Sequence, residues 1–246
     1  MLQVTLVAAA PSCSGYQLHA IDATQRAMVS IKQRPLVTGI GIGFLMLMVL
    51  PFALYAARSG VAGLFTPGIV DSRFFVAGRG VGNHAIFGHM LLGGMLTLLI
   101  PLQLWGALRH RFPALHRWSG RLLITFAVIT GLGGLLYIAL RGTIGGFWMD
   151  AGFTLYGVLL VLSAAQAIRF ARAGRYGAHR RWALRLFVLA MGSWLYRVQY
   201  GIWYALTGGV ASTPTFEGTF DLVQNVAFYL PYLLLLEVWL RKSAPR

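Results

Sequence analysis

The sequence is built from long apolar segments that contain few charges. Apolar residues make up 57% of the 246 residues, and charged residues only 11%. A helix needs about 20 apolar residues to cross the roughly 30 Å hydrocarbon core of a bilayer. This composition excludes a water-soluble globular protein and predicts an all-α integral membrane protein. We expect six transmembrane helices, near residues 36–57, 82–107, 119–140, 152–169, 184–206 and 221–240.

Two basic stretches that precede apolar segments resemble each other. The first contains His116-Arg117-Trp118 and the second His179-Arg180-Arg181-Trp182. This recurrence predicts a duplicated two-helix unit, from which a central four-helix bundle would form. In parallel repeats the two histidines would lie at one depth in the membrane. Aligned on the histidines, the segments behind them agree at Leu123 and Leu186, Ala127 and Ala190, Thr130 and Ser193, Leu132 and Leu195, and Tyr137 and Tyr200.

Basic residues are concentrated in alternate connections. They precede the first span, fill the second and fourth connections and follow the last span, whereas the other loops hold few of them. Because cytoplasmic loops carry the excess of Lys and Arg, we expect both termini in the cytoplasm and the protein in the cytoplasmic (inner) membrane. The net charge of +15 is then a sign of topology, and nucleic-acid binding is not expected.

The first residues contain neither a recognisable signal peptide nor a span. We expect residues 1–27 to be disordered, and Met28 is an alternative to Met1 as the translation start. The expected divisions of the chain are a cytoplasmic leader over 1–35, the six-helix transmembrane domain over 36–240 and a cytoplasmic tail over 241–246.

Three polar side chains within the expected spans are further candidates. At 100° per residue, His89 shares a helix face with small residues, and Gln103 lies about 40° from the same line. Histidine and arginine are costly in lipid unless they have partners, so His89 and Arg197 are candidate functional residues. His89 is interpreted as a packing residue or a contact to a quinone. Asp150 or Asp221 could supply the charge that Arg197 needs.

The matched position of His116 and His179 suggests that they share a ligand. Haem iron accepts two axial imidazoles, so the pair could hold a b-type haem, with metal ligation through these two residues alone. Arg121 and Arg185 could pair with the anionic propionates. Alternatively, the histidines are hydrogen-bonding anchors in the headgroup layer, or the basic stretches bind an anionic lipid or metabolite.

The same motifs resemble an uncharacterised family of predicted multi-pass membrane proteins, classified only as a domain of unknown function. The resemblance covers roughly residues 36 to 205, and Ala183 stands where the family is expected to have methionine. It implies no activity. The architecture is also similar to that of six-helix b-type cytochromes, although those use four histidines on four central helices. The residues that carry the family resemblance are His89, Pro101-Leu-Gln103, His116-Arg117-Trp118-Ser-Gly120-Arg121, His179-Arg180-Arg181-Trp182-Ala183-Leu184-Arg185 and Arg197.

Two classes of function follow from these features. The first is a haem-binding redox protein that exchanges electrons with a quinone or a partner oxidoreductase. The second is a non-catalytic membrane protein or small-solute transporter that uses His89, Gln103 and Arg197 as polar sites. Against transport, the sequence shows no pair of interrupted spans. Membrane lipids are partners in either case, and the sequence decides neither enzymatic activity nor oligomeric state.

Overall fold

The computed structural model describes residues 14–66 and 74–243, with side chains from Thr38 onward. The chain forms two compact units, Met1–Gly41 and Ile42–Arg246, and both candidate sites described below belong to the second unit. Of the expected leader, residues 1–13 lie outside the described residues and the rest falls in the first helix. The disorder of residues 1–27 stays a prediction.

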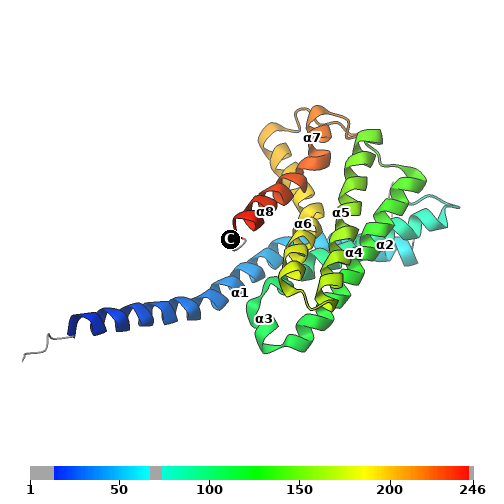
Figure 1. The fold of residues 1–246 in the computed structure, drawn as a ribbon. Coiled ribbons are helices and arrows are strands. Elements are labelled where there is room, and N and C mark those ends of the chain that lie inside the picture. The colour runs from blue at the N-terminus through cyan, green and yellow to red at the C-terminus, as the bar shows by residue number, and fades with distance from the viewer. Residues whose placement is uncertain (1–13, 67–73, 244–246) are drawn as a thin grey trace, which may run out of the picture. The chain divides into compact units, whose positions relative to one another are not determined.

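Helices account for nearly all of the regular structure in the described residues, which confirms the expected all-α class. Short turns connect most of them, and Figure 1 shows their arrangement. In chain order they are α1 (Ser14–Phe65), α2 (Gly80–Leu99), the 3₁₀ segment η2 (Ile100–Leu104), α3 (Gly106–Arg111), α4 (Pro113–Arg141), α5 (Gly146–Arg172), α6 (Tyr176–Thr207), α7 (Thr219–Ala227) and α8 (Leu230–Lys242).

Five segments are long and apolar enough to cross a membrane, compared with the six that the sequence predicts. The expected span at 184–206 is the difference. It lies within α6, which has 32 residues. The mean hydropathy of α6 is lower than that of the five segments, because its C-terminal half carries Arg197, Gln199 and several tyrosines. The five segments are Thr38–Phe65, Gly80–Leu104, Pro113–Arg141, Gly146–Arg172 and Thr219–Lys242.

Two of these five segments are interrupted, contrary to the expectation that no spans are broken. The helix that starts at Gly80 tightens into η2 at Ile100, with Pro101 inside the 3₁₀ turn. The last segment breaks between α7 and α8, where Phe228 and Tyr229 separate the helices and Pro231 lies in the first turn of α8. Proline has no backbone N–H and its ring clashes with the preceding turn, so it favours an interruption at these two points, although α1 continues through Pro51.

Four helices form a closed ring around the core. Contacts join α2 to α4, α4 to α5, α5 to α6, and α6 back to α2. Consequently α4 and α6 stand at opposite corners of the ring, as do α2 and α5. The predicted four-helix bundle, built from a duplicated two-helix unit, stays a prediction, because the ring contains α2 and not the last segment. The fully buried core side chains include Phe87, Leu96, Ala127, Leu160, Ala164, Leu189, Phe228 and Tyr229.

The basic connections lie together at one end of the ring. The antiparallel order of α4, α5 and α6 places α3 and the 173–175 turn at this basic end, whereas the 142–145 turn, the 208–218 loop and α7 lie at the opposite end (Figure 1). The separation is the one expected if the basic end faces the cytoplasm.

Glycine determines how closely α2 and α4 approach. A Cβ atom at Gly133 would lie 2.9 Å from the Ala85 carbonyl oxygen, and one at Gly134 would lie 3.0 Å from His89 Nδ1. Thr130 fills the space opposite Gly93, where a Cβ would lie 3.2 Å from the Thr130 methyl carbon. Small residues at such crossings are what allows membrane helices to pack tightly.

We therefore expect Gly133→Ala to destabilise the protein by about 1–3 kcal/mol, because backbone atoms of α2 must move away. The matched control is Gly88→Ala on α2, since a Cβ there meets no atom within 4 Å. Apparent melting temperatures in detergent measure both variants. Equal melting temperatures would contradict the close approach of α2 and α4.

The sequence and the ring together predict a topology with both termini in the cytoplasm. Reporter fusions after residue 246 and within 108–118 should report cytoplasm, and fusions within 58–80 and 207–220 should report the outside. A cytoplasmic signal from a fusion in 207–220 would rule out α6 as a sixth span.

Candidate functional site

The two histidine boxes form helix starts of the same design. His116 is the fourth residue of α4 and His179 the fourth residue of α6. The residues before these helices have similar backbone angles, φ −129° and ψ 62° at Phe112 and φ −86° and ψ 67° at Arg175. In each case the carbonyl of that residue accepts a hydrogen bond from the backbone N–H of the histidine, at 3.0 Å for His116 and 2.9 Å for His179. The sequence repeat is therefore matched by a repeated local structure.

The structure places both imidazoles at the basic end. They come from opposite corners of the ring and lie close enough to interact electrostatically. His179 Nδ1 donates a hydrogen bond to the Ala167 carbonyl of α5 at 2.8 Å. In the neutral ring, this bond leaves Nε2 of His179 with a free lone pair. His116 Nδ1 is buried and has no hydrogen-bond partner among the described residues.

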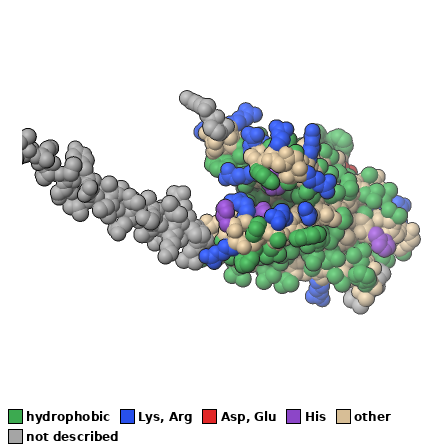
Figure 2. Space-filling model, turned by 60° about the horizontal axis from the view of Figure 1, so that its bottom comes forward, with side chains coloured by type: hydrophobic (Ala, Val, Ile, Leu, Met, Phe, Trp, Pro, Cys, Tyr) green, Lys and Arg blue, Asp and Glu red, His purple; other side chains and the backbone are tan. Residues whose placement is uncertain are grey.

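A hollow opens on this face of the molecule. Figure 2 shows it with Lys and Arg side chains around its edge and histidine side chains inside it. Arg109 and Arg117 act electrostatically on His116, so both lie near its ring. Neither arginine was among the site residues that the sequence analysis singled out, although both belong to the first basic stretch.

The two arginines predicted to bind an anionic group have different surroundings. Arg121 is exposed, and its guanidinium lies 5.0 Å from the centre of the Trp118 ring. Arg185 lies over Trp182 and forms a two-point ion pair with Glu237 of α8, in which Nη2 donates to Oε2 at 2.9 Å. Arg121 is therefore available to a ligand, whereas Arg185 ties α8 to α6.

Gln103 belongs to the basic end and not to the surroundings of His89. Its side chain donates to Ser119 Oγ at 2.8 Å, and Ser119 in turn donates to the Leu115 carbonyl. Gln103 thus fastens η2 to the first turns of α4. The expected shared face with His89 assumed a continuous α-helix, and the 3₁₀ segment changes the rotation per residue.

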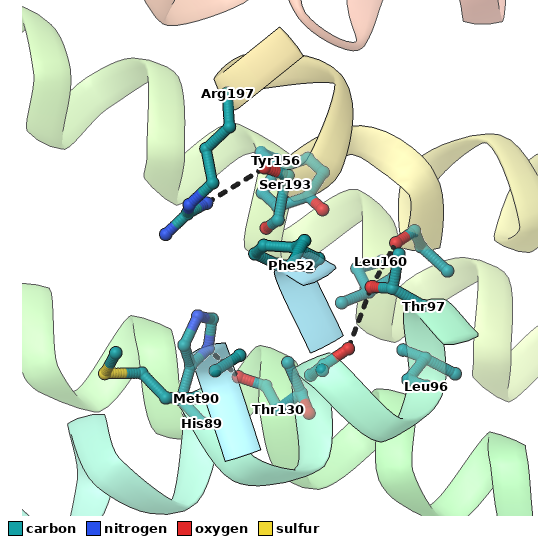
Figure 3. A pocket seen from close by; sticks show the side chains of 14 residues that line it. Phe52, His89, Met90, Leu96, Thr97, Thr130, Tyr156, Leu160, Ser193 and Arg197 are labelled. Carbon is teal, nitrogen blue, oxygen red and sulfur yellow. Dashed lines mark hydrogen bonds between the residues drawn. The ribbon is translucent and has the colours of Figure 1, made fainter. Parts of the chain in front are cut away.

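A second site lies inside the ring, toward the opposite end. It is a cavity of about 50 Å³ between α1, α2, α4, α5 and α6, several times the space that one buried water requires. Figure 3 shows His89 and Arg197 extending into it from α2 and α6, beside Phe52. The remaining polar groups in its wall come from Thr97, Thr130, Tyr156 and Ser193.

Hydrogen bonds fix the orientation of most polar side chains around the cavity. His89 Nδ1 donates to the Thr130 carbonyl at 2.8 Å. Tyr156 donates to the Leu189 carbonyl at 2.6 Å, and Thr97 donates to the Gly93 and Ala190 carbonyls. The Thr130 hydroxyl, in contrast, is buried and has no partner among the described residues. The sequence gives no sign that Phe52, Thr130 and Tyr156 line one cavity, because a helical pattern does not show which side chains of different helices meet.

No carboxylate pairs with Arg197 in the part of the chain that the structure describes. Its Nη1 donates to the Ser193 carbonyl at 2.9 Å, and its guanidinium lies 4.7 Å from the centre of the Phe52 ring. The suggestion that Asp150 or Asp221 neutralises it is wrong. Asp150 accepts from the Thr143 N–H, and Asp221 from Tyr200, Ser212 and two backbone N–H groups.

Comparison with known proteins gives one match. A family model described as "Predicted membrane protein (DUF2306)" matches residues 86–240, which is more than half of the chain. The matched range runs from α2 to α8 and includes both histidine boxes. No curated protein and no solved structure matches. The match confirms the family of unknown function expected from the motifs, and its description names no cofactor or activity.

The ion pair between α6 and α8 can be tested directly. Glu237→Gln removes one charge of a partly buried pair and should lower stability by roughly 1 kcal/mol. The control is Glu217→Gln in the exposed 208–218 loop, where the carboxylate accepts only from Thr215 among the described residues. A melting temperature that falls equally in both variants would show that the Arg185–Glu237 pair does not hold α8.

Proposed function

The chain belongs to the DUF2306 family of predicted membrane proteins, and we propose that this member spans the membrane six times and binds a b-type haem between His116 and His179. In this proposal α6 is the sixth span. Its 32 residues extend about 48 Å, more than the bilayer core requires. Gln199 and Tyr200 of α6 are tolerated because they hydrogen-bond to polar side chains of the last segment.

The single observation that carries the haem proposal is the juxtaposition of two matched histidines. They start helices at opposite corners of the ring, on either side of α5, and α4 and α6 have few direct contacts with each other. A haem between two such helices could be held by one imidazole from each of them. The bond from His179 Nδ1 to Ala167 orients that ring in the manner usual for metal-ligating histidines.

Unpaired polar atoms at the basic end fit a bound group. Buried polar groups without partners are rare, and each calls for an explanation such as a ligand or water. Trp105 Nε1, His116 Nδ1 and Gln166 Oε1 are all buried without hydrogen-bond partners among the described residues. All three belong to segments that lie at the basic end of the ring.

The charge of this end also suits a haem. Its propionates are anionic, and Arg109, Arg117 and Arg121 are positioned at the basic end without a carboxylate partner among the described ion pairs. When bound, haem would supply one-electron transfer at its iron. The chain's own residues would hold the iron, exclude water with the ring helices and neutralise the propionates. Electrons would pass to or from a quinone or a partner oxidoreductase.

Transport of a small solute is the second candidate function. The interruptions at η2 and between α7 and α8 favour it, since broken helices form the substrate sites of many transporters. Neither interruption lines the central cavity, however. For this reason we place the redox proposal first.

Haem binding predicts a visible spectrum. Protein purified from haem-replete cells should show the absorption of a low-spin b-type haem, with bands that sharpen on reduction. His116→Ala and His179→Ala should each reduce haem content to background, because each removes an axial ligand. Arg121→Gln should weaken haem retention and leave the spectral type unchanged.

Two histidines outside the pair provide controls. His110→Ala changes an exposed residue of the same basic connection, and His84→Ala changes an exposed residue of α2 whose ring contacts only the Gly80 carbonyl. Both should retain full haem content. A folded, haem-supplied wild-type protein without a Soret band would rule out the haem proposal and favour the headgroup-anchor interpretation.

A further inference from the structure

We propose that the central cavity binds the head group of a quinone or quinol, with Arg197 donating to one ring oxygen and His89 Nε2 accepting from the other when it is a hydroxyl. The cavity is separate from the histidine pair, and its walls come from α1 and all four ring helices. Its part in electron transfer rests on the haem proposal above, whereas its ligand binding does not.

The tautomer of His89 makes its ring an acceptor within the cavity. Since a backbone carbonyl only accepts, the bond to Thr130 requires the hydrogen on Nδ1. In the neutral ring Nε2 therefore carries a lone pair, and no described residue donates to it. Gly134 packs against the ring edge and keeps it in this orientation.

Arg197 supplies the complementary donors. Its guanidinium has five N–H groups, of which one bonds within its own helix to Ser193. It lies ten residues from the end of α6 at Thr207, or about 15 Å, and His89 lies nine residues from the start of α2, or about 14 Å. Both residues are thus deep in the bilayer. An arginine at this depth requires a polar or anionic partner.

The cavity is accessible from outside the ring at Arg197. The side chain is exposed, although it also lines the cavity. At this depth the surrounding medium is lipid and not water. The ligand expected at such an opening is one that dissolves in the membrane and carries a polar head.

The set of polar groups favours a quinol over a carboxylic acid. A carboxylate has only acceptor oxygens, so it would satisfy Arg197 and leave His89 Nε2 without a donor. A quinol has a hydroxyl on each side of its ring and can both donate and accept. The unpaired, buried Thr130 hydroxyl is the kind of group that a ligand of mixed character completes.

The apolar part of the wall is also suited to a ring. Phe52, Met90, Leu96 and Leu160 line the cavity together with Tyr156. A cavity that encloses benzene has about 150 Å³, so the roughly 50 Å³ here holds one edge of a ring, and the rest of the ring extends through the opening at Arg197. Ligand pockets of this type combine an apolar lining with a few fixed polar groups.

The test is the binding of ubiquinol-1, kept reduced under anaerobic conditions, to the full-length protein in nanodiscs, followed by quenching of tryptophan fluorescence and corrected with empty nanodiscs. His89→Asn keeps a donor at the Nδ1 position and removes Nε2, so binding should weaken about tenfold or more. Arg197→Gln should have an effect of similar size. Thr130→Val, which keeps the shape of the side chain, should weaken binding severalfold without loss of the folded protein.

Matched controls are His84→Asn and Arg58→Gln, both exposed residues outside the cavity, which should bind as the wild type does. His116→Ala should retain quinone binding even when haem is lost, so the two proposals fail independently. The assignment is overturned if ubiquinol-1 does not bind, if the Thr130 and His89 variants bind it like wild type, or if benzoate alone binds.

Discussion

The close approach of α2 and α4 is the contact on which both sites depend. Helices in lipid gain little from burying apolar area against one another, so they associate through tight packing and hydrogen bonds. Gly133 and Gly134 remove the side chains that would separate these two helices, and His89 then reaches the Thr130 carbonyl at 2.8 Å. That hydrogen bond ties α2 to α4 and orients the His89 imidazole into the cavity. It leaves the Thr130 hydroxyl without a partner among the described residues.

The two ends of the ring deal with charge in different ways. At the end that holds α7, the buried carboxylate is fully engaged: Asp221 accepts from Tyr200, Ser212 and two backbone N–H groups, and so holds the 208–218 loop against α6. At the basic end only Arg185 forms an ion pair among the described residues. Uncompensated positive charge is therefore concentrated around His116 and His179. An anionic group is attracted to the basic end and not to the other.

His116 and His179 stand out in the sequence because the basic boxes repeat, and the structure shows that each box starts a helix in the same way. Their role in haem binding stays a prediction. The sequence-based placement of a side chain was wrong where the helix type changes locally or where the partner is distant in the sequence. Gln103 was placed by α-helical rotation, but it follows Pro101 in a 3₁₀ turn and bonds to Ser119. Arg185 looked free, because Glu237 is 52 residues away in the sequence. Tyr156 and Phe52 carried no signal, since an aromatic residue in an apolar helix is ordinary.

The sequence by itself determined the class of the protein, the approximate positions of its helices and the sign of the charge at each end. These properties depend on composition and on residues near one another in the chain, through the bilayer's requirement for apolar, internally hydrogen-bonded segments. Only the tertiary structure decided that α4 and α6 face each other across the ring, that α2 and α5 do the same, and which polar groups share a cavity. Helical periodicity places a side chain on a face, and the packing of small residues decides which helix that face meets.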